Sequence, residues 1–176
     1  MRTLFGSLFC LLAAPALALD LESKFSNIDG GTHQLSNWAG QPILVVNTAS
    51  LCGFTGQYSD LQKLHDTYSD KGLVVLAVPS DDFSQELGSE DEVKEFCEVN
   101  YNITLPMTGI TNVTGPDAHP FYKSLAAEEG FQPTWNFNKV LIDTDGEVAG
   151  TFRSSVKPMS RQITGPIEDM LNQMGG

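Results

Sequence analysis

Cys52 lies where an apolar, β-branched run gives way to a helical pattern, within the stretch NTASLCGFTGQ at residues 47–57. A thiol near the start of a helix lies close to unpaired backbone N–H groups and to the positive end of the helix dipole, and both favour the thiolate. Ordinary thiols are only slightly ionised at neutral pH. The position therefore indicates a nucleophilic cysteine, and the alternative is a small buried hydrophobic residue at a strand end.

Cys97 is the second candidate thiol. Ser89 is a good N-cap before an acidic first turn, and the pattern predicts a helix to about residue 100 with Val93, Phe96 and Cys97 on one side. Cys97 is then either a core residue or a partner for Cys52. A structural disulfide and a redox-cycling pair are both consistent with this spacing.

Residues 1–18, MRTLFGSLFCLLAAPALA, have the basic start, apolar run and small-residue end of a secretory signal peptide. We expect the leader, with Cys10 in it, to be removed, and residues 19–176 to form a single domain in the periplasm or outside the cell. Beyond the leader no stretch approaches the roughly 18 apolar residues of a membrane span, so no stable membrane insertion is expected.

The chain is strongly acidic, with a formal net charge of −12. Loss of the single positive charge of Arg2 with the leader would make it −13. A surface of this sign disfavours nucleic acid, whose phosphates require a cationic face. His33, His65 and His119 show no metal-ligand spacing with the cysteines, so we expect neither a metal nor another cofactor.

The hydrophobic pattern around Cys52 predicts a parallel βαβ unit. Two buried strands, 43–48 and 73–78, flank a helix over 58–71 with apolar residues three and four apart. The entry segment 19–42 contains a turn signal at 29–31.

The remaining pattern predicts a weak strand at 105–114, a short helix at 117–127, a hairpin over 138–152 that turns at 144–146, and a last helix at 160–174. This element order predicts an α/β protein of thioredoxin-like fold, with a central mixed sheet flanked by helices.

Six segments together make the chain resemble the glutathione peroxidase family. They occur in the family's order and nearly its spacing, across about residues 22 to 172: NTASLCGFTGQ at 47–57, GLVVLAVP at 72–79, QELGS at 85–89, EFCEVNYNITLP at 95–106, NVTGPDAHPFY at 112–122 and WNFNKVLIDTDG at 135–146.

The resemblance implies a peroxidase that reduces hydrogen peroxide and organic or lipid hydroperoxides. It assigns Cys52 as the peroxidatic cysteine, and Gln85, Trp135 and Asn136 as the other members of the family's catalytic tetrad. Without the resemblance, Gln85 is equally a solvated loop residue, Trp135 a core aromatic and Asn136 a turn residue. Attack on a peroxide requires donors that orient the O–O bond and stabilise developing charge, which indole and amide groups supply.

The resemblance also implies partners. Cys97 falls where many cysteine-type members carry the resolving cysteine, which condenses with the Cys52 sulfenic acid to a disulfide. In such members the reductant is typically a thioredoxin-like protein rather than glutathione. The chain between Tyr122 and Trp135 lacks the insertion through which family tetramers assemble, which predicts a monomer with an open site.

The chain departs from the family pattern beside the site. The loop at 79–88, PSDDFSQELG, is one residue shorter than usual and carries Asp81 and Asp82 in place of an asparagine–glutamine pair. The assignment of Gln85 therefore assumes a one-residue deletion. Leu51 replaces a lysine that is common before the cysteine, and carboxylates near Cys52 would oppose thiolate formation.

Two other functions fit the same fold and compartment. One is a thiol–disulfide oxidoreductase acting on exported proteins, although its usual Cys-x-x-Cys motif is missing because Thr55 stands three residues after Cys52. The other is a non-catalytic binding domain with a static bridge between Cys52 and Cys97.

Overall fold

A four-stranded mixed sheet forms the centre of the computed structural model, which describes residues 19–175. The expected signal peptide and Cys10 lie outside the described residues. Strands β3 (Ile43–Thr48) and β4 (Val74–Pro79) pair in parallel, whereas β5 (Lys139–Ile142) is antiparallel to both β3 and β6 (Val148–Phe152). The order is β4-β3-β5-β6, which confirms the predicted central mixed sheet and the parallel βαβ unit.

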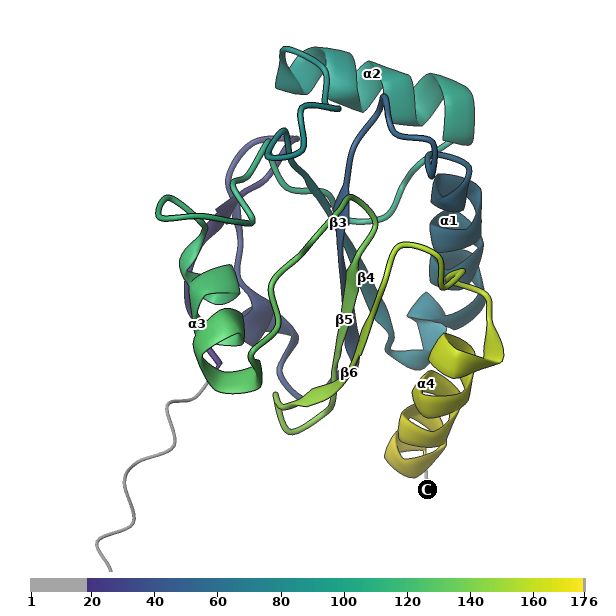
Figure 1. The fold of residues 1–176 in the computed structure, drawn as a ribbon. Coiled ribbons are helices and arrows are strands. Elements are labelled where there is room, and N and C mark those ends of the chain that lie inside the picture. The colour runs from purple at the N-terminus through teal and green to yellow at the C-terminus, as the bar shows by residue number, and fades with distance from the viewer. Residues whose placement is uncertain (1–18, 176) are drawn as a thin grey trace, which may run out of the picture.

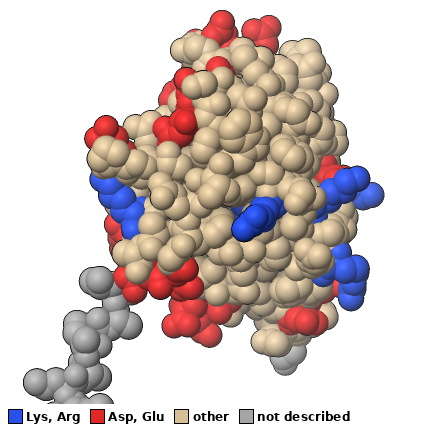
Figure 2. Space-filling view, viewed as in Figure 1, with Lys and Arg blue, Asp and Glu red and all other residues tan. Residues whose placement is uncertain are grey.

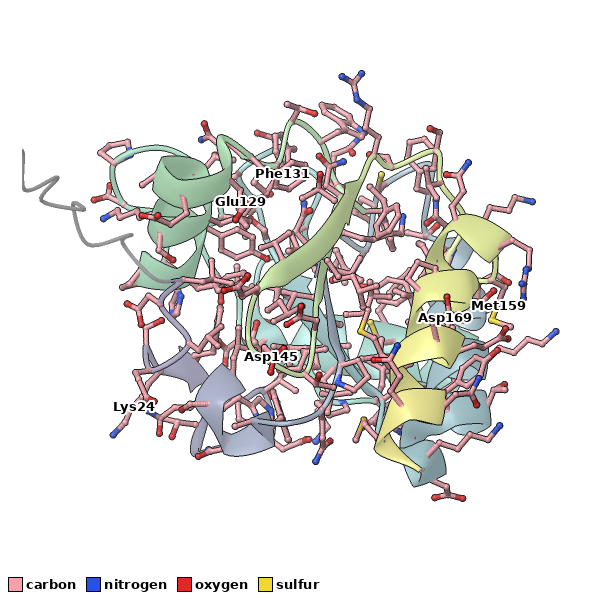
Figure 3. All side chains as sticks on the ribbon, turned by 90° about the horizontal axis from the view of Figure 1, so that it is seen from below. Lys24, Glu129, Phe131, Asp145, Met159 and Asp169 are labelled. Carbon is pink, nitrogen blue, oxygen red and sulfur yellow. The ribbon has the colours of Figure 1, made fainter. Side chains whose placement is uncertain are left out.

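Helices cover both faces of the sheet and one of its ends. Helices α1 (Gln57–Tyr68) and α4 (Arg161–Met174) lie on one face, and α3 (Pro120–Glu129) lies on the other (Figure 1). The view from below agrees, with α4 and α3 on opposite sides of the strands (Figure 3). Helix α2 (Glu90–Tyr101) crosses the end of the sheet toward which the loop after β3 rises (Figure 1).

The helices on both faces of the sheet explain why its central strands are apolar at almost every position. Leu44 and Val46 of β3 belong to the core beneath α1 and α4, whereas Ile43 and Val45 belong to the core beneath α3. Successive side chains of a strand point to opposite faces, so a strand buried on both faces needs apolar residues at every position. The sheet therefore holds the ends of its strands, where the candidate residues lie, in fixed positions.

The shorter elements also follow the sequence, with one exception. The turn at 29–31 joins β1 (Phe25–Ser26) to β2 (Thr32–His33), and 3₁₀ turns occupy Leu35–Trp38 and Ser69–Lys71. The predicted hairpin is present, and Gly146 supplies its turn with φ of 86°.

The prediction of a strand at 105–114 is wrong. Met107 makes a single parallel bridge to Ala77, and Thr108 makes an isolated antiparallel bridge to Asn27. Pro106 has no N–H to donate, so it contributes only its carbonyl, which accepts from Ala77 N at 3.0 Å. The segment therefore covers the edge of β4 without becoming a fifth strand.

Acidic side chains gather on the face shown in Figure 2, at the end occupied by α2 and at the opposite lower edge, whereas its cations are scattered. None of the helices within residues 19–175 combines the length and apolarity needed to cross a bilayer. Over the same residues, no cluster of three or more histidine, cysteine or acidic side chains could hold a metal ion.

Candidate active site

Cys52 lies in a run of turns between β3 and α1, and its side chain is 4% exposed. Its sulfur accepts a hydrogen bond from the Phe54 backbone N–H at 3.5 Å. The expected place at the start of a helix needs correction, because α1 begins only at Gln57 and the dipole effect falls off within the first turn. The intervening turn, closed by Thr55 N–H to the Cys52 carbonyl at 3.1 Å, instead carries the Phe54 N–H that bonds the sulfur.

The loop after β4 lies directly beside the Cys52 loop. The Leu51 N–H donates to the Gln85 carbonyl at 2.9 Å, and the Ser50 N–H donates to Glu86 Oε1 at 2.9 Å. Burial raises the pKa of the Glu86 carboxyl, although its bonds from Ser50 and Leu87 oppose the shift. These bonds bring the Gln85 backbone next to the backbone that carries Cys52.

Asn136 extends this arrangement from the opposite side. It lies just before β5 and is fully buried, and its Nδ2 donates to Gln85 Oε1 at 3.0 Å. Its own Oδ1 is buried without a hydrogen-bond partner in the described chain. Because Gln85 Oε1 accepts from Asn136, the Gln85 NH₂ is the part of that amide that can still donate.

Trp135 reaches the surface beside the buried amides. Its side chain is 42% exposed, and its ring packs on Phe83 with centroids 5.5 Å apart. The structure thus joins Gln85 and Asn136 by a hydrogen bond, places Trp135 next to Asn136 in the chain, and ties Gln85 to the residue before Cys52.

Cys97 is buried within α2, at 1% exposed, and neither it nor Cys52 is in a disulfide. Burial raises the pKa of the Cys97 thiol to about 11, a shift that the Tyr58 hydroxyl beside it partly offsets. Cys97 also lines a cavity of about 200 Å³ under α2, together with Ile28, Ile103 and Met107. The reduced Cys97 therefore has the character of a core residue, with open space at one side.

The two aspartates of the short loop accept hydrogen bonds from backbone N–H groups. Asp82 Oδ2 accepts from Val113 N–H at 2.6 Å and from Thr114 N–H at 2.8 Å. Asp81 Oδ1 accepts from Glu86 N–H at 3.1 Å. These hydrogen bonds stabilise the fold of the loop that carries Gln85.

Several polar residues that support the site were missed by the sequence interpretation. Asn47, Glu86, Lys139 and Ser154 are all buried. Burial lowers the pKa of Lys139 to about 7. A signal for two of them was present in the sequence, because Asn47 near the end of β3 and Lys139 at the start of β5 are polar residues in strands that are otherwise mainly apolar.

The fold and the site together define a thioredoxin-like protein with a buried free cysteine directly after a central strand. The chain belongs to the glutathione peroxidase family, whose pattern it matches over residues 21–126. It is therefore a peroxidase.

Three relatives agree with this assignment. The glutathione peroxidase homolog BsaA of Bacillus subtilis is 38% identical over 156 residues, covering 85% of this chain and 96% of the relative. The hydroperoxy fatty acid reductase gpx1 of Synechocystis is 40% identical over 155 residues, covering 82% and 90%. The glutathione peroxidase-like peroxiredoxin 2 of Saccharomyces cerevisiae is 40% identical over 147 residues, covering 80% and 90%.

Solved structures give the same fold. The crystal structure of Trgpx in its apo form superimposes with a TM-score of 0.70 and 32% identity, covering 89% of this chain and 98% of that one. A thioredoxin family protein from Chlorobium tepidum, a thiol:disulfide interchange protein, has a TM-score of 0.65 at 17% identity, covering 90% and 99%. The second likeness concerns the fold alone.

Proposed function

We propose that Cys52 is the peroxidatic cysteine and reduces hydrogen peroxide and organic or lipid hydroperoxides. The Cys52 thiolate attacks one peroxide oxygen, the O–O bond breaks, and the other oxygen leaves as water or an alcohol after taking a proton. Cys52 becomes a sulfenic acid. The observation that carries this proposal is the chain of hydrogen bonds from Asn136 Nδ2 to Gln85 Oε1, and from the Gln85 carbonyl to Leu51 N–H beside Cys52.

In this proposal Gln85, Trp135 and Asn136 stabilise the charge that develops on the two oxygens. Amide and indole groups donate hydrogen bonds without titrating, and such preorganised donors are the usual means of stabilising an oxyanion. The exposed ring of Trp135, packed on Phe83, gives an apolar rim that suits a lipid hydroperoxide. The name of the hydroperoxy fatty acid reductase from Synechocystis supports the same substrate class.

We further propose that Cys97 resolves the sulfenic acid. Its thiol attacks the Cys52 sulfur, a disulfide forms, and the hydroxyl leaves as water. Both cysteines belong to one buried cluster, but Cys97 is held inside a helix, so α2 has to unwind partly before the two sulfurs bond. A thioredoxin-like protein would then reduce the disulfide, as the peroxiredoxin name of the yeast relative suggests, with glutathione as the alternative reductant.

The setting of this chemistry is also a proposal. Residues 1–18 would direct export to the periplasm or the cell exterior, and the mature enzyme would act there as a single-domain monomer. Its electrons then have to come from a reductant outside the cytosol.

Stopped-flow oxidation of the reduced mature protein tests the first step. We expect hydrogen peroxide and cumene hydroperoxide to oxidise the wild type and Cys97→Ser at similar rates, and to leave Cys52→Ser unoxidised. Peroxide consumption that survives Cys52→Ser would contradict the proposal. Rapid reaction with protein disulfides but not with peroxides would instead favour a thiol–disulfide oxidoreductase.

A further inference from the structure

Three consecutive backbone carbonyls beside the site are each held by a different buried side chain. Asn47 Nδ2 donates to the Trp135 carbonyl at 3.0 Å, and Ser154 Oγ donates to the Asn136 carbonyl at 2.6 Å. Lys139 Nζ donates to the Phe137 carbonyl at 2.8 Å. These three donors come from β3, from β5 and from the segment directly after β6, so two strands and this segment together hold residues 135–137.

The held segment has a backbone conformation that needs support. Phe137 has φ of 60°, and a bulky residue at positive φ is strained by about 1 to 3 kcal/mol. Its N–H donates to the Asn47 carbonyl at 2.6 Å, and its ring is fully buried against Tyr58. The left-handed turn at Phe137 separates Asn136, which points to Gln85, from β5, which begins two residues later.

We propose that Asn47, Lys139 and Ser154 are positioning residues that fix Trp135 and Asn136 by holding the carbonyls of residues 135–137. We call this set the carbonyl clamp. The inference rests on the proposed function, because it gives the clamp its purpose: a donor displaced by about 1 Å costs up to ~100-fold in rate. None of the three is assigned contact with the peroxide.

Burial of the Lys139 amine costs free energy, and packing alone does not explain why a lysine occupies this position. It is fully buried in a strand between two hydrophobic cores, and within the described chain its ammonium group bonds only the Phe137 carbonyl. A buried amine with one acceptor is unfavourable compared with an apolar side chain of the same size. The hydrogen bond from Lys139 to the strained turn at Phe137 accounts for a lysine at this position.

Ser154 connects the clamp to the helix that follows Cys52. Its Oγ accepts from Asn138 Nδ2 at 2.8 Å while donating to Asn136, and its carbonyl accepts from Gln57 Nε2 at 2.6 Å. Gln57 is the first residue of α1. One serine therefore joins the Asn136 backbone to the element that begins directly after the Cys52 turn.

The test compares Ser154→Ala and Lys139→Met with the wild type, with the exposed neighbour Ser155→Ala as control and Ser154→Thr to restore the hydroxyl. The second-order rate of Cys52 oxidation by hydrogen peroxide is measured by stopped flow. Emission of Trp135 is measured in a Trp38→Phe background, because Trp38 is the other tryptophan. Thermal unfolding shows what fraction of each variant is folded.

We expect Ser154→Ala and Lys139→Met to slow oxidation by about tenfold or more and to shift Trp135 emission while still folded. Ser154→Thr should recover most of the rate, and Ser155→Ala should match the wild type. A folded Ser154→Ala with the wild-type rate and emission would overturn the inference, as would losses that only follow the unfolded fraction. If the wild type itself resists oxidation, the proposed function fails. The Trp135 emission of Ser154→Ala and Lys139→Met then still shows whether the carbonyl clamp fixes Trp135.

Discussion

The segment around Asn136 and the helix that carries Cys97 are held in opposite ways. Buried side chains from two strands and from the segment after β6 hold the carbonyls of residues 135–137. Of the twelve residues of α2, by contrast, two are buried, Val93 and Cys97, and a cavity of about 200 Å³ lies beside Cys97. Its other contacts are partly buried or exposed, such as the packing of Phe96 and Tyr101 on the core and the ion pair of Lys94 with Asp29.

This difference matches the two steps that the proposed cycle requires. Oxidation of Cys52 needs donors held within a fraction of an ångström, whereas formation of the disulfide needs a helix that can open at low cost. Exposed ion pairs contribute little to stability, and a helix with few buried residues can unfold locally without the rest of the molecule. In the proposed cycle, the fixed donors and the helix that opens are therefore separate elements around the same cysteine.

Removing the Cys97 thiol should have the largest effect on turnover. Cys97→Ser should reduce steady-state peroxide consumption with thioredoxin, thioredoxin reductase and NADPH to near background, because no disulfide can form for the reductant to attack. The first oxidation of Cys52 should stay within about twofold, since Cys97 acts after it. Sustained thioredoxin-dependent turnover in Cys97→Ser would contradict a resolving role for Cys97 and a need for α2 to open.

Removing a fixed donor should slow the first step instead. Asn136→Ala should reduce the rate of Cys52 oxidation by about 100-fold, the usual cost of losing one preorganised donor. Asn172→Ala, at an exposed asparagine of α4, is the matched control. Single-turnover stopped flow with hydrogen peroxide separates the two variants, and equal rates would show that Asn136 has no part in the chemistry.

The pH dependence of stability should report Lys139. Burial lowers its pKa to about 7 from the ordinary 10.5, so between these values the unfolded chain binds a proton that the folded chain does not. Stability therefore gains as pH rises through this window and loses as pH falls through it, by at most about 1.4 kcal/mol per pH unit.

Lys139→Met should remove this dependence, whereas the exposed control Lys157→Met should retain it. Denaturant unfolding at pH 7, 8 and 9 measures the difference from the wild type. A difference that is constant across the three pH values would mean that the buried amine does not titrate in this window.

The smallest effect should come from loosening the start of α2. Ser89 Oγ accepts from Glu92 N–H at 3.3 Å, and loss of such an N-cap costs about 1 kcal/mol. Ser89→Ala should lower the free energy of unfolding by that amount and leave the first oxidation unchanged. Quenched-flow measurement should show disulfide formation as fast as, or faster than, in the wild type. A slower disulfide step would contradict the idea that α2 opens to react.

The strands and helices were predictable because their patterns are strong and local. The apolar run at 43–48, the turn at Gly146 and the cap at Ser89 each specify their element without help from distant residues. The strand expected at 105–114 failed because Pro106 limits its pairing to isolated bridges, a tertiary outcome that apolar content does not reveal.

The site was predictable only in part, for a similar reason. The resemblance named Cys52, Gln85 and Asn136, and the hydrogen bonds of the latter two agree with a shared site. The supporting contacts of Ser154 and Glu86 span 18 and 36 residues, and no local spacing encodes such pairs. The aspartates of the short loop illustrate the same limit, because their partners lie in other parts of the backbone.

Hydrogen–deuterium exchange of the reduced protein and of the protein treated with one equivalent of hydrogen peroxide tests the contrast between the two regions most directly. We predict faster exchange across Glu90–Tyr101 after oxidation, because α2 has to open for the disulfide, and unchanged exchange across residues 134–142. Cys97→Ser should show no faster exchange across α2 after the same treatment. Unaltered exchange in α2 of the oxidised wild type, or loss of protection at residues 134–142, would contradict the account.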